Sequence, residues 1–227
     1  MKKLIVGLSL ALTSLTGYAV NPLWLRNACI SPDGKEIAFC YKGDIYKVPV
    51  QGGTAVQLTT LPSYETHPVW SPDGKQLAFA SDRHGSLDIF VMPATGGSAR
   101  RLTYHSAAET PSAFTPDGKH ILFSASIQDP SASVLFPSGA MSELYQVPVD
   151  GGRTTQVLGT PAESVCFSQK GKRFLYQDQK GFESEWRKHH TSSITRDIWV
   201  YDVETGKHTN LTNREGEDRN AVFAPDE

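Results

Sequence analysis

Short apolar runs, separated by clusters of glycine, proline, aspartate and serine, follow one another along most of this chain. One pattern of ten residues is written three times and then once more in degraded form, as ISPDGKEIAF (30–39), WSPDGKQLAF (70–79), FTPDGKHILF (114–123) and FSQKGKRFLY (167–176). Counted from its Ser or Thr, the pattern recurs after 40, 44 and 53 residues. A recurrence at this spacing is typical of folds built from repeated supersecondary units.

Each copy predicts a hairpin followed by a buried strand. Proline presets φ near −65° in a tight turn, and glycine allows the positive φ that such a turn needs, so Ser-Pro-Asp-Gly joins two antiparallel strands. The segments that follow (IAF, LAF, ILF, FLY) are apolar at consecutive positions rather than at alternating ones. Such runs are expected in strands that are covered on both faces.

A third and a fourth strand are predicted after each copy. The third strands lie in GDIYKVPVQGG (43–53), LDIFVMPATGG (87–97), SELYQVPVDGG (142–152) and RDIWVYDVETG (196–206). Three of these strands carry a proline near their end (Pro49, Pro93, Pro148), where a missing N–H costs little. The Gly-Gly or Thr-Gly ending predicts a second hairpin into a fourth strand, which closes on Leu58-Thr59, Leu102-Thr103, Val157-Leu158 and Leu211-Thr212.

Four strands per repeat indicate an all-β fold, a β-propeller of four-stranded blades. We expect four full blades at about residues 28–60, 66–104, 110–159 and 163–213. The ending AVFAPDE resembles the opening of another copy, so residues 219–227 are expected to start a fifth blade and the propeller to be incomplete. The lack of a 3.6-residue periodicity excludes a helical solenoid, and a β-sandwich stays open as an alternative.

The N-terminus has the pattern of a secretory signal. In MKKLIVGLSLALTSLTGYA two lysines precede an apolar run, and small residues stand at the positions that a signal peptidase reads. We assign residues 1–19 to a signal peptide and residues 20–227 to the partial propeller. The apolar run is too short for a membrane span, so the protein is expected to be exported, periplasmic or secreted, with no span after cleavage.

Charge and cysteine content narrow the function further. The chain has 22 Lys plus Arg and 24 Asp plus Glu, which gives no bias toward nucleic acid or an acidic membrane. Three cysteines do not make a disulfide framework. Cys29 and Cys166 occupy the same position of their repeats, too far apart in a ring to bond, and we interpret them as small buried packing residues.

No catalytic or metal-binding pattern emerges from the polar residues. Acids recur at the start of each third strand, but one acid per blade does not converge on an ion, so local hydrogen bonds to turn N–H groups explain them better (Asp44, Asp88, Glu143, Asp197). Five histidines fall in or beside predicted turns and are expected at the surface (His67, His84, His105, His120, His208). Without HExxH, GxSxG, CxxC or a phosphate-binding loop, we expect no catalytic residue, metal or cofactor in this chain.

Two insertions interrupt the repeat, both between the second and third strands, at 126–143 and 177–196. Insertions at one repeated place should lie on one face of the ring, where propellers often bind partners. The second contains an aromatic and cationic cluster that could hold a carboxylate, such as a peptide C-terminus or an acidic partner surface (Trp186, Arg187, Lys188, His189, His190). An ordinary solvated loop, or a contact with other domains, is the alternative.

These motifs resemble a known group of propellers. The SPDGK turn, the DIY/DIF/DIW strand and the closing Leu-Thr are similar to the WD-like repeats of the Tol-system propeller and the tricorn protease group. PLWLRNACISPDGKEIAFCYKGDIYKVPVQGG (22–53) and WRKHHTSSITRDIWVYDVETGKHTNLT (186–212) resemble the N-terminal propeller of secreted bacterial tricorn protease homologs. The resemblance covers nearly all of residues 20–227, and only the QKG of the fourth turn departs from the repeat.

The resemblance implies that a second propeller, a PDZ-like module and a serine peptidase domain follow the first propeller. Under this interpretation the chain filters substrates or docks the other domains, its partners are peptides or unfolded protein segments, and the full-length protein can form a homo-oligomer. The peptidase's catalytic residues would lie outside this chain. A non-catalytic periplasmic scaffold and the propeller of a prolyl-oligopeptidase-type hydrolase are the alternatives.

Overall fold

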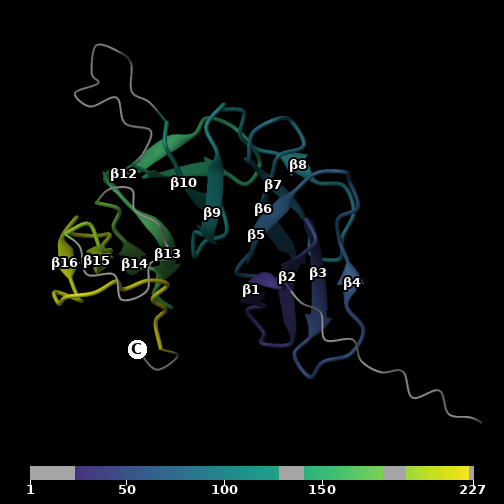
Figure 1. Cartoon of the computed structure of the whole chain (residues 1–227), viewed down its shortest axis with the longest axis horizontal. Coiled ribbons are helices and arrows are strands. Elements are labelled where there is room, and N and C mark those ends of the chain that lie inside the picture. The colour runs from purple at the N-terminus through teal and green to yellow at the C-terminus, as the bar shows by residue number, and fades with distance from the viewer. Residues whose placement is uncertain (1–23, 128–140, 181–192, 225–227) are drawn as a thin grey trace, which may run out of the picture.

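The structure, a computed structural model, describes residues 24–127, 141–180 and 193–224. Within these ranges every regular element is a strand, and the strands form four sheets of four (Figure 1). The first blade contains β1 (Arg26–Ile30), β2 (Glu36–Tyr41), β3 (Asp44–Pro49) and β4 (Val56–Gln57). The second contains β5 (Glu65–Trp70), β6 (Gln76–Ser81), β7 (Asp88–Pro93) and β8 (Arg100–Arg101).

The third blade contains β9 (Glu109–Phe114), β10 (His120–Ala125), β11 (Glu143–Pro148) and β12 (Thr155–Pro161). The fourth contains β13 (Glu163–Phe167), β14 (Arg173–Gln177), β15 (Ile198–Asp202) and β16 (His208–Asn210). Every sheet is an antiparallel meander in chain order. The expected β-propeller of four-stranded blades is therefore confirmed, and the sandwich alternative is wrong.

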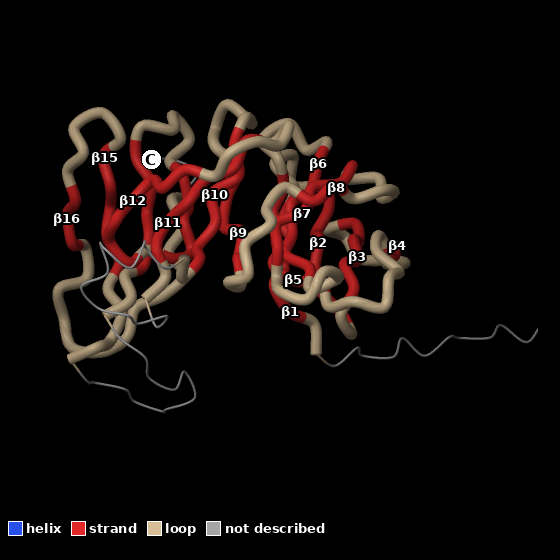
Figure 2. Tube along the Cα trace, turned by 90° about the horizontal axis from the view of Figure 1, so that it is seen from above, coloured by secondary structure: helices blue, strands red, loops and turns tan. Residues whose placement is uncertain are grey.

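The first strand of each blade lies nearest the axis. Contacts between blades join β1 to β5, β5 to β9 and β9 to β13, and Figure 1 shows these strands facing a common centre. Figure 2, turned by a right angle, shows the blades standing side by side. The chain segment after β16 repeats the first step of a new blade: Asp218 N–H donates to Arg196 O at 3.0 Å, as Glu65 N–H donates to Gly43 O at 2.7 Å.

Each seam between blades joins an aromatic face to an aliphatic face. In blade two the rings of Phe79 and Phe90, 5.8 Å apart, pack against Ala38 and Ile45 of blade one. Corresponding aromatic pairs fill the next two seams, Phe123 with Tyr145 and Tyr176 with Trp199. Because each fully buried aromatic side chain stabilises by roughly 1.5–3 kcal/mol, these seams hold the arc together.

Blade one carries the same aromatic pair on its other face. The rings of Phe39 and Tyr46 lie 5.8 Å apart, and side chains alternate along β2, so Phe39 points away from the seam that Ala38 and Cys40 enter. Ile30 on β1 is 58% exposed. Blade one therefore has the aromatic face that packs against a preceding blade in the other repeats, although no blade among the described residues packs against it.

The Ser-Pro-Asp-Gly turn forms as the sequence predicts. In blade two Ser71 Oγ donates to Asp73 Oδ1 at 2.6 Å, Lys75 N–H donates to the same oxygen at 3.1 Å, and Gly74 has φ +70°. In blade four Gln and Lys replace Pro and Asp, yet Gly171 N–H still donates to Ser168 O at 2.9 Å. The backbone turn therefore survives without the aspartate.

The closing Leu-Thr joins the fourth strand to the third. Leu58 N–H donates to Ile45 O at 2.8 Å, and Thr59 Oγ1 accepts from Ile45 N–H at 2.9 Å. The same pair of bonds recurs at Thr103 and Thr212. The hydroxyl thus supplies the acceptor that the short outer strand lacks.

The acids that open the third strands do not bind turn N–H groups, so that prediction is wrong. Asp44 accepts from the Gln57 and Thr59 side chains, and Asp88 pairs with Arg101. Glu143 accepts from Tyr145, and Asp197 pairs with Lys180 and accepts from Asn210. Most of these partners stand on or beside the neighbouring outer strand, because a side chain at the strand's start reaches across the sheet more easily than back into its own turn.

Candidate functional site

A central cavity of about 760 Å³ opens between the innermost strands. Residues of β1, β5, β9 and β13 line it, and so does the segment 219–222 that follows β16. Because all the repeats contribute to one wall, the cavity is the candidate functional site of this chain.

A backbone bulge in each innermost strand shapes the cavity wall. Asn27, His67 and Ser164 have positive φ (49°, 52° and 52°), and the pairing with the second strand shifts register around each of them. Asn220, with φ 55°, stands at the corresponding place three residues before Phe223. A bulge places two residues opposite one and re-aims the side chain, here toward the axis.

Blade three reaches the same result with proline. Pro111 occupies the bulge position of β9, and the register shifts between Leu122 and Phe123 of the facing strand. Proline cannot adopt positive φ, so this bulge has a different local geometry. All the bulge residues nevertheless line the cavity. The sequence contains a signal for these bulges, because the bulge residue of each blade stands four residues before the Ser or Thr of its turn motif. The signal is hard to recognise, because the bulge residues differ in type.

His67 is not a surface turn residue, which corrects that prediction. It lies inside β5, half-buried against the cavity, with Nδ1 3.0 Å from Thr66 Oγ1. Burial lowers the pKa of the imidazole. Thr66 Oγ1 also donates to Asn27 Oδ1 of blade one at 3.1 Å, so the first two bulges are linked across their seam.

The predicted packing role of the cysteines holds for Cys40 and only in part for Cys29 and Cys166. Cys29 and Cys166 hold the same strand position, opposite Ala38 and Leu175, and all three thiols are free. Cys40 is buried in the first seam, but Cys29 and Cys166 are only half-buried and line the cavity. Burial and a neighbouring thiol raise the pKa of Cys29 to about 12. A thiol with this pKa is a poor nucleophile, because the thiolate is the reactive form.

Short hydroxyl and amide side chains share the rest of the wall with small apolar residues such as Ala28, Ala108 and Ala125. The hydroxyl and amide side chains include Thr110, Ser112, Ser124, Ser126, Ser142 and Gln177. Such groups both donate and accept hydrogen bonds, and they leave room for a ligand because they are small. The wall therefore fits a ligand rich in amide groups, as a peptide main chain is.

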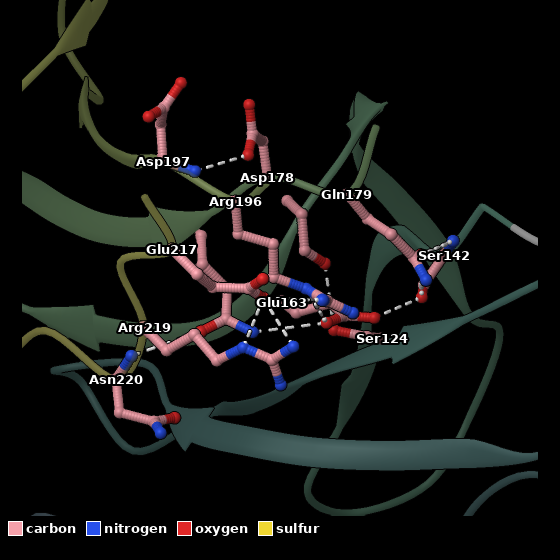
Figure 3. Close-up of polar contacts among 12 residues, drawn as sticks. Ser124, Ser142, Glu163, Asp178, Gln179, Arg196, Asp197, Glu217, Arg219 and Asn220 are labelled. Carbon is pink, nitrogen blue, oxygen red and sulfur yellow. Dashed lines mark hydrogen bonds and ion pairs between the residues drawn. The ribbon is translucent and has the colours of Figure 1, made fainter. Parts of the chain in front are cut away.

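The charged side chains at the cavity neutralise one another (Figure 3). Arg196 Nη1 donates to Glu217 Oε1 at 3.0 Å, and its Nε lies 3.6 Å from Glu163 Oε2. Arg219 pairs with Glu217. This chain of two acids and two bases ties β13 to the segment after β16, so the wall presents little net charge to a ligand.

Both insertions leave the sheets at the rim of this cavity. Ser142, at the end of the first insertion, donates through its N–H to Gln179 Oε1 at 2.8 Å, and its hydroxyl lies 2.7 Å from Glu163 Oε1 (Figure 3). Gln179 belongs to the start of the second insertion. The described ends of the two insertions therefore meet on one face of the arc, as the repeat predicts.

The predicted carboxylate-binding cluster cannot be placed. Residues 186–190 (Trp186, Arg187, Lys188, His189, His190) lie outside the described residues. The described ends of their insertion are anchored by Lys180, which pairs with Asp197 at 2.6 Å, and by Arg196. Among the described residues, no group of His, Cys, Asp or Glu side chains has the arrangement of a metal site, and no helix is long and apolar enough to cross a membrane.

Fold and cavity together define a β-propeller domain with a polar central site. The chain belongs to the family of the tricorn protease N-terminal β-propeller domain, whose model matches residues 22–227. No curated protein matches it.

Solved structures agree in fold. A structure of tricorn protease matches with a TM-score of 0.67 and 21% identity over 85% of this chain and 18% of that one. Putative TolB from Agrobacterium tumefaciens gives a TM-score of 0.62 and 25% identity over 82% of this chain and 64% of that one. The structure of a puromycin hydrolase mutant gives a TM-score of 0.57 and 14% identity over 86% of this chain and 29% of that one. The chain thus spans less than two thirds of the length of each of these proteins.

Proposed function

We propose that this chain is the N-terminal propeller of an exported tricorn-like serine peptidase, and that its central cavity admits extended peptides to a peptidase domain elsewhere in the full-length protein. Family membership supports the peptidase context. The observation that carries the role of the cavity is its wall, to which every repeat contributes and in which blades one, three and four place small hydroxyl and amide side chains. Such a wall can bind any main chain while remaining indifferent to side-chain charge, which suits a filter for unfolded segments.

Narrowing the cavity in the full-length protein tests this role. Ala28 and Ala108 are exposed on the cavity wall, so Ala28→Trp and Ala108→Trp should obstruct it at little cost in stability. We expect the KM for a long unstructured peptide to rise several-fold more than that for a dipeptide substrate. Ala55→Trp, exposed beside β4, is the matched control. If KM changes by the same factor for the long and the short substrate in all three variants, the cavity does not act as a filter.

The second insertion offers a separate contact for peptides or for another domain. Its sequence places Trp186, Arg187, Lys188, His189 and His190 between ends that meet at the cavity rim. The Arg187→Ala, Lys188→Ala double variant should weaken binding of a peptide with a free carboxylate more than binding of its amide. If both peptides bind as they do to the unaltered protein, these residues serve another purpose.

A non-catalytic periplasmic scaffold is the second candidate, favoured by the likeness to putative TolB. Such a scaffold would bind partner proteins through the same rim. The peptidase and the scaffold can be distinguished with the purified full-length protein. It is incubated with a fluorogenic peptide and, separately, with a serine-directed phosphonate probe. Covalent labelling supports the peptidase, whereas an unlabelled protein without hydrolysis supports the scaffold.

A further inference from the structure

The seam between blades two and three encloses two carboxylates. Asp88 opens β7 and is fully buried, and Glu109 opens β9 and is 1% exposed. Among the described residues, neither oxygen of Asp88 accepts a hydrogen bond. Glu109 accepts one from the hydroxyl of Thr103. Buried carboxylates are costly when ionised, so this seam needs a source of positive charge.

One guanidinium faces the two acids. Arg101 Nη2 lies 2.8 Å from Asp88 Oδ2, while its Nε donates to Thr103 O at 2.8 Å and its guanidinium stands 4.6 Å from the ring centroid of Tyr104. Arg101 is thus held toward Asp88. The attraction between Arg101 and the Glu109 carboxylate is weaker, because Arg101 is more distant from Glu109 than from Asp88. The negative charge of Asp88 repels the Glu109 carboxylate.

The preceding seam shows how the same position is neutralised elsewhere. Glu65, which opens β5 as Glu109 opens β9, is also fully buried. It has its own cation, Arg83, whose Nη2 lies 3.0 Å from Oε1, and the same oxygen accepts hydrogen bonds from Ser63 and Ser81, while Oε2 has no hydrogen-bond partner among the described residues. Blade three has Ala125 where blade two has Ser81. Glu109 therefore lacks the partners that make a buried carboxylate tolerable at Glu65.

We propose that the seam between blades two and three retains one proton on Glu109, next to the Asp88–Arg101 pair, and that release of this proton loosens the contact between the two blades. The seam then holds one anion and one cation when closed. Ionisation of Glu109 adds a second buried anion without a second cation. Residues on either side of Glu109, Ala108 and Thr110, line the cavity, so the proton also governs part of the cavity wall.

The electrostatics agree with this geometry. Burial, followed by repulsion from Asp88, raises the pKa of Glu109 to about 7, against the opposing hydrogen bond from Thr103. An acid with a raised pKa in the folded state binds a proton more tightly than the unfolded chain does. The stabilising effect is complete below the unfolded pKa and is lost as the pH rises toward the folded pKa.

The variant Glu109→Gln tests the proposal, because an amide resembles the protonated carboxyl group in shape. Between about pH 5 and pH 7, the unfolding equilibrium constant of the unaltered protein should rise by roughly 40-fold relative to that of Glu109→Gln. His67 acts in the opposite direction but is present in both proteins and cancels in the comparison. Glu204→Gln, which is exposed, should keep the unaltered pH dependence. Parallel pH profiles for the protein and Glu109→Gln would overturn the proposal.

Infrared spectroscopy tests the proton directly, even if Glu109→Gln unfolds. At about pH 6 the unaltered protein should show the C=O stretching band of a protonated carboxyl group, and the band should disappear near pH 8. Glu65→Gln, at the matching place in the preceding seam, should keep the band. Absence of the band from the unaltered protein at pH 6 would overturn the proposal. The amide protection factors, which correct for the base catalysis of hydrogen exchange, should fall in β7 and β9 above about pH 7 and stay constant in β1.

Discussion

Gly171 in the turn of blade four lies directly against Pro116 in the turn of blade three. A Cβ atom on Gly171 would come within 2.7 Å of Pro116 Cγ. Gly118 and Pro72, and likewise Gly74 and Pro32, stand in the same relation at 3.9 Å. The proline and the glycine of the turn motif therefore serve the contact between blades as well as the turn itself.

Replacing Gly171 by alanine should destabilise the protein more than the same change at Gly34. Both glycines have positive φ, which costs a non-glycine residue about 1 kcal/mol, but only Gly171 has a close neighbour. Overpacking should add roughly 1–3 kcal/mol to the loss of unfolding free energy in Gly171→Ala. Urea denaturation of the two variants measures the difference. Equal losses would mean that the turns can separate freely.

Thr59→Val should destabilise the fold because it removes a hydrogen-bond acceptor while conserving shape. Ile45 N–H is buried and donates to Thr59 Oγ1, so it would lose its partner. The expected cost is about 1–3 kcal/mol of unfolding free energy. Thr54→Val, an exposed change in the same loop region, is the control and should cost far less. A similar cost for both variants would show that the Leu-Thr motif acts through something other than this bond.

Acidification should weaken the fold through His67. Burial lowers the pKa of this histidine below its usual 6.5, so the unfolded chain takes up a proton below about pH 6.5 before the folded protein does. His67→Asn removes the group that binds this proton, and asparagine tolerates the positive φ of this position. The melting temperature of His67→Asn should therefore fall less than that of the unaltered protein between pH 7 and about pH 5.5. The two proteins should differ by a constant amount above pH 7, and a constant difference at every pH would contradict the prediction.

The positive φ of Ser164 in its bulge should determine which substitutions are tolerated there. With φ 52°, serine is strained there, and glycine is not. Ser164→Gly should leave stability unchanged or raise it slightly, whereas Ser164→Val should cost about 1–2 kcal/mol because a β-branched residue is disfavoured in this region. Thermal unfolding of both variants checks this. If valine is tolerated as well as glycine, the backbone of β13 can adopt another register.

The repeat made most of the fold predictable. Ser-Pro-Asp-Gly specifies its turn through bonds within a few residues, as Ser71 and Asp73 show, so a local pattern was enough. The central cavity was harder to foresee. The bulge residues differ in type (Asn27, His67, Pro111, Ser164, Asn220), and what they share is a backbone position rather than a side chain. The acids that open the third strands were misassigned for a related reason, because most of their partners lie on or beside the neighbouring strand.

The blades follow from the local sequence, since turns and apolar runs act over short distances and leave their pattern in every copy. Which side chains meet between copies depends on how the blades pack. Glu65 and Glu109 look alike in the repeat, yet one has an arginine and two hydroxyl groups beside it and the other shares a distant arginine with a second acid. Charge and burial depend on neighbours from other blades, and the distances to those neighbours are set by packing rather than by spacing along the chain.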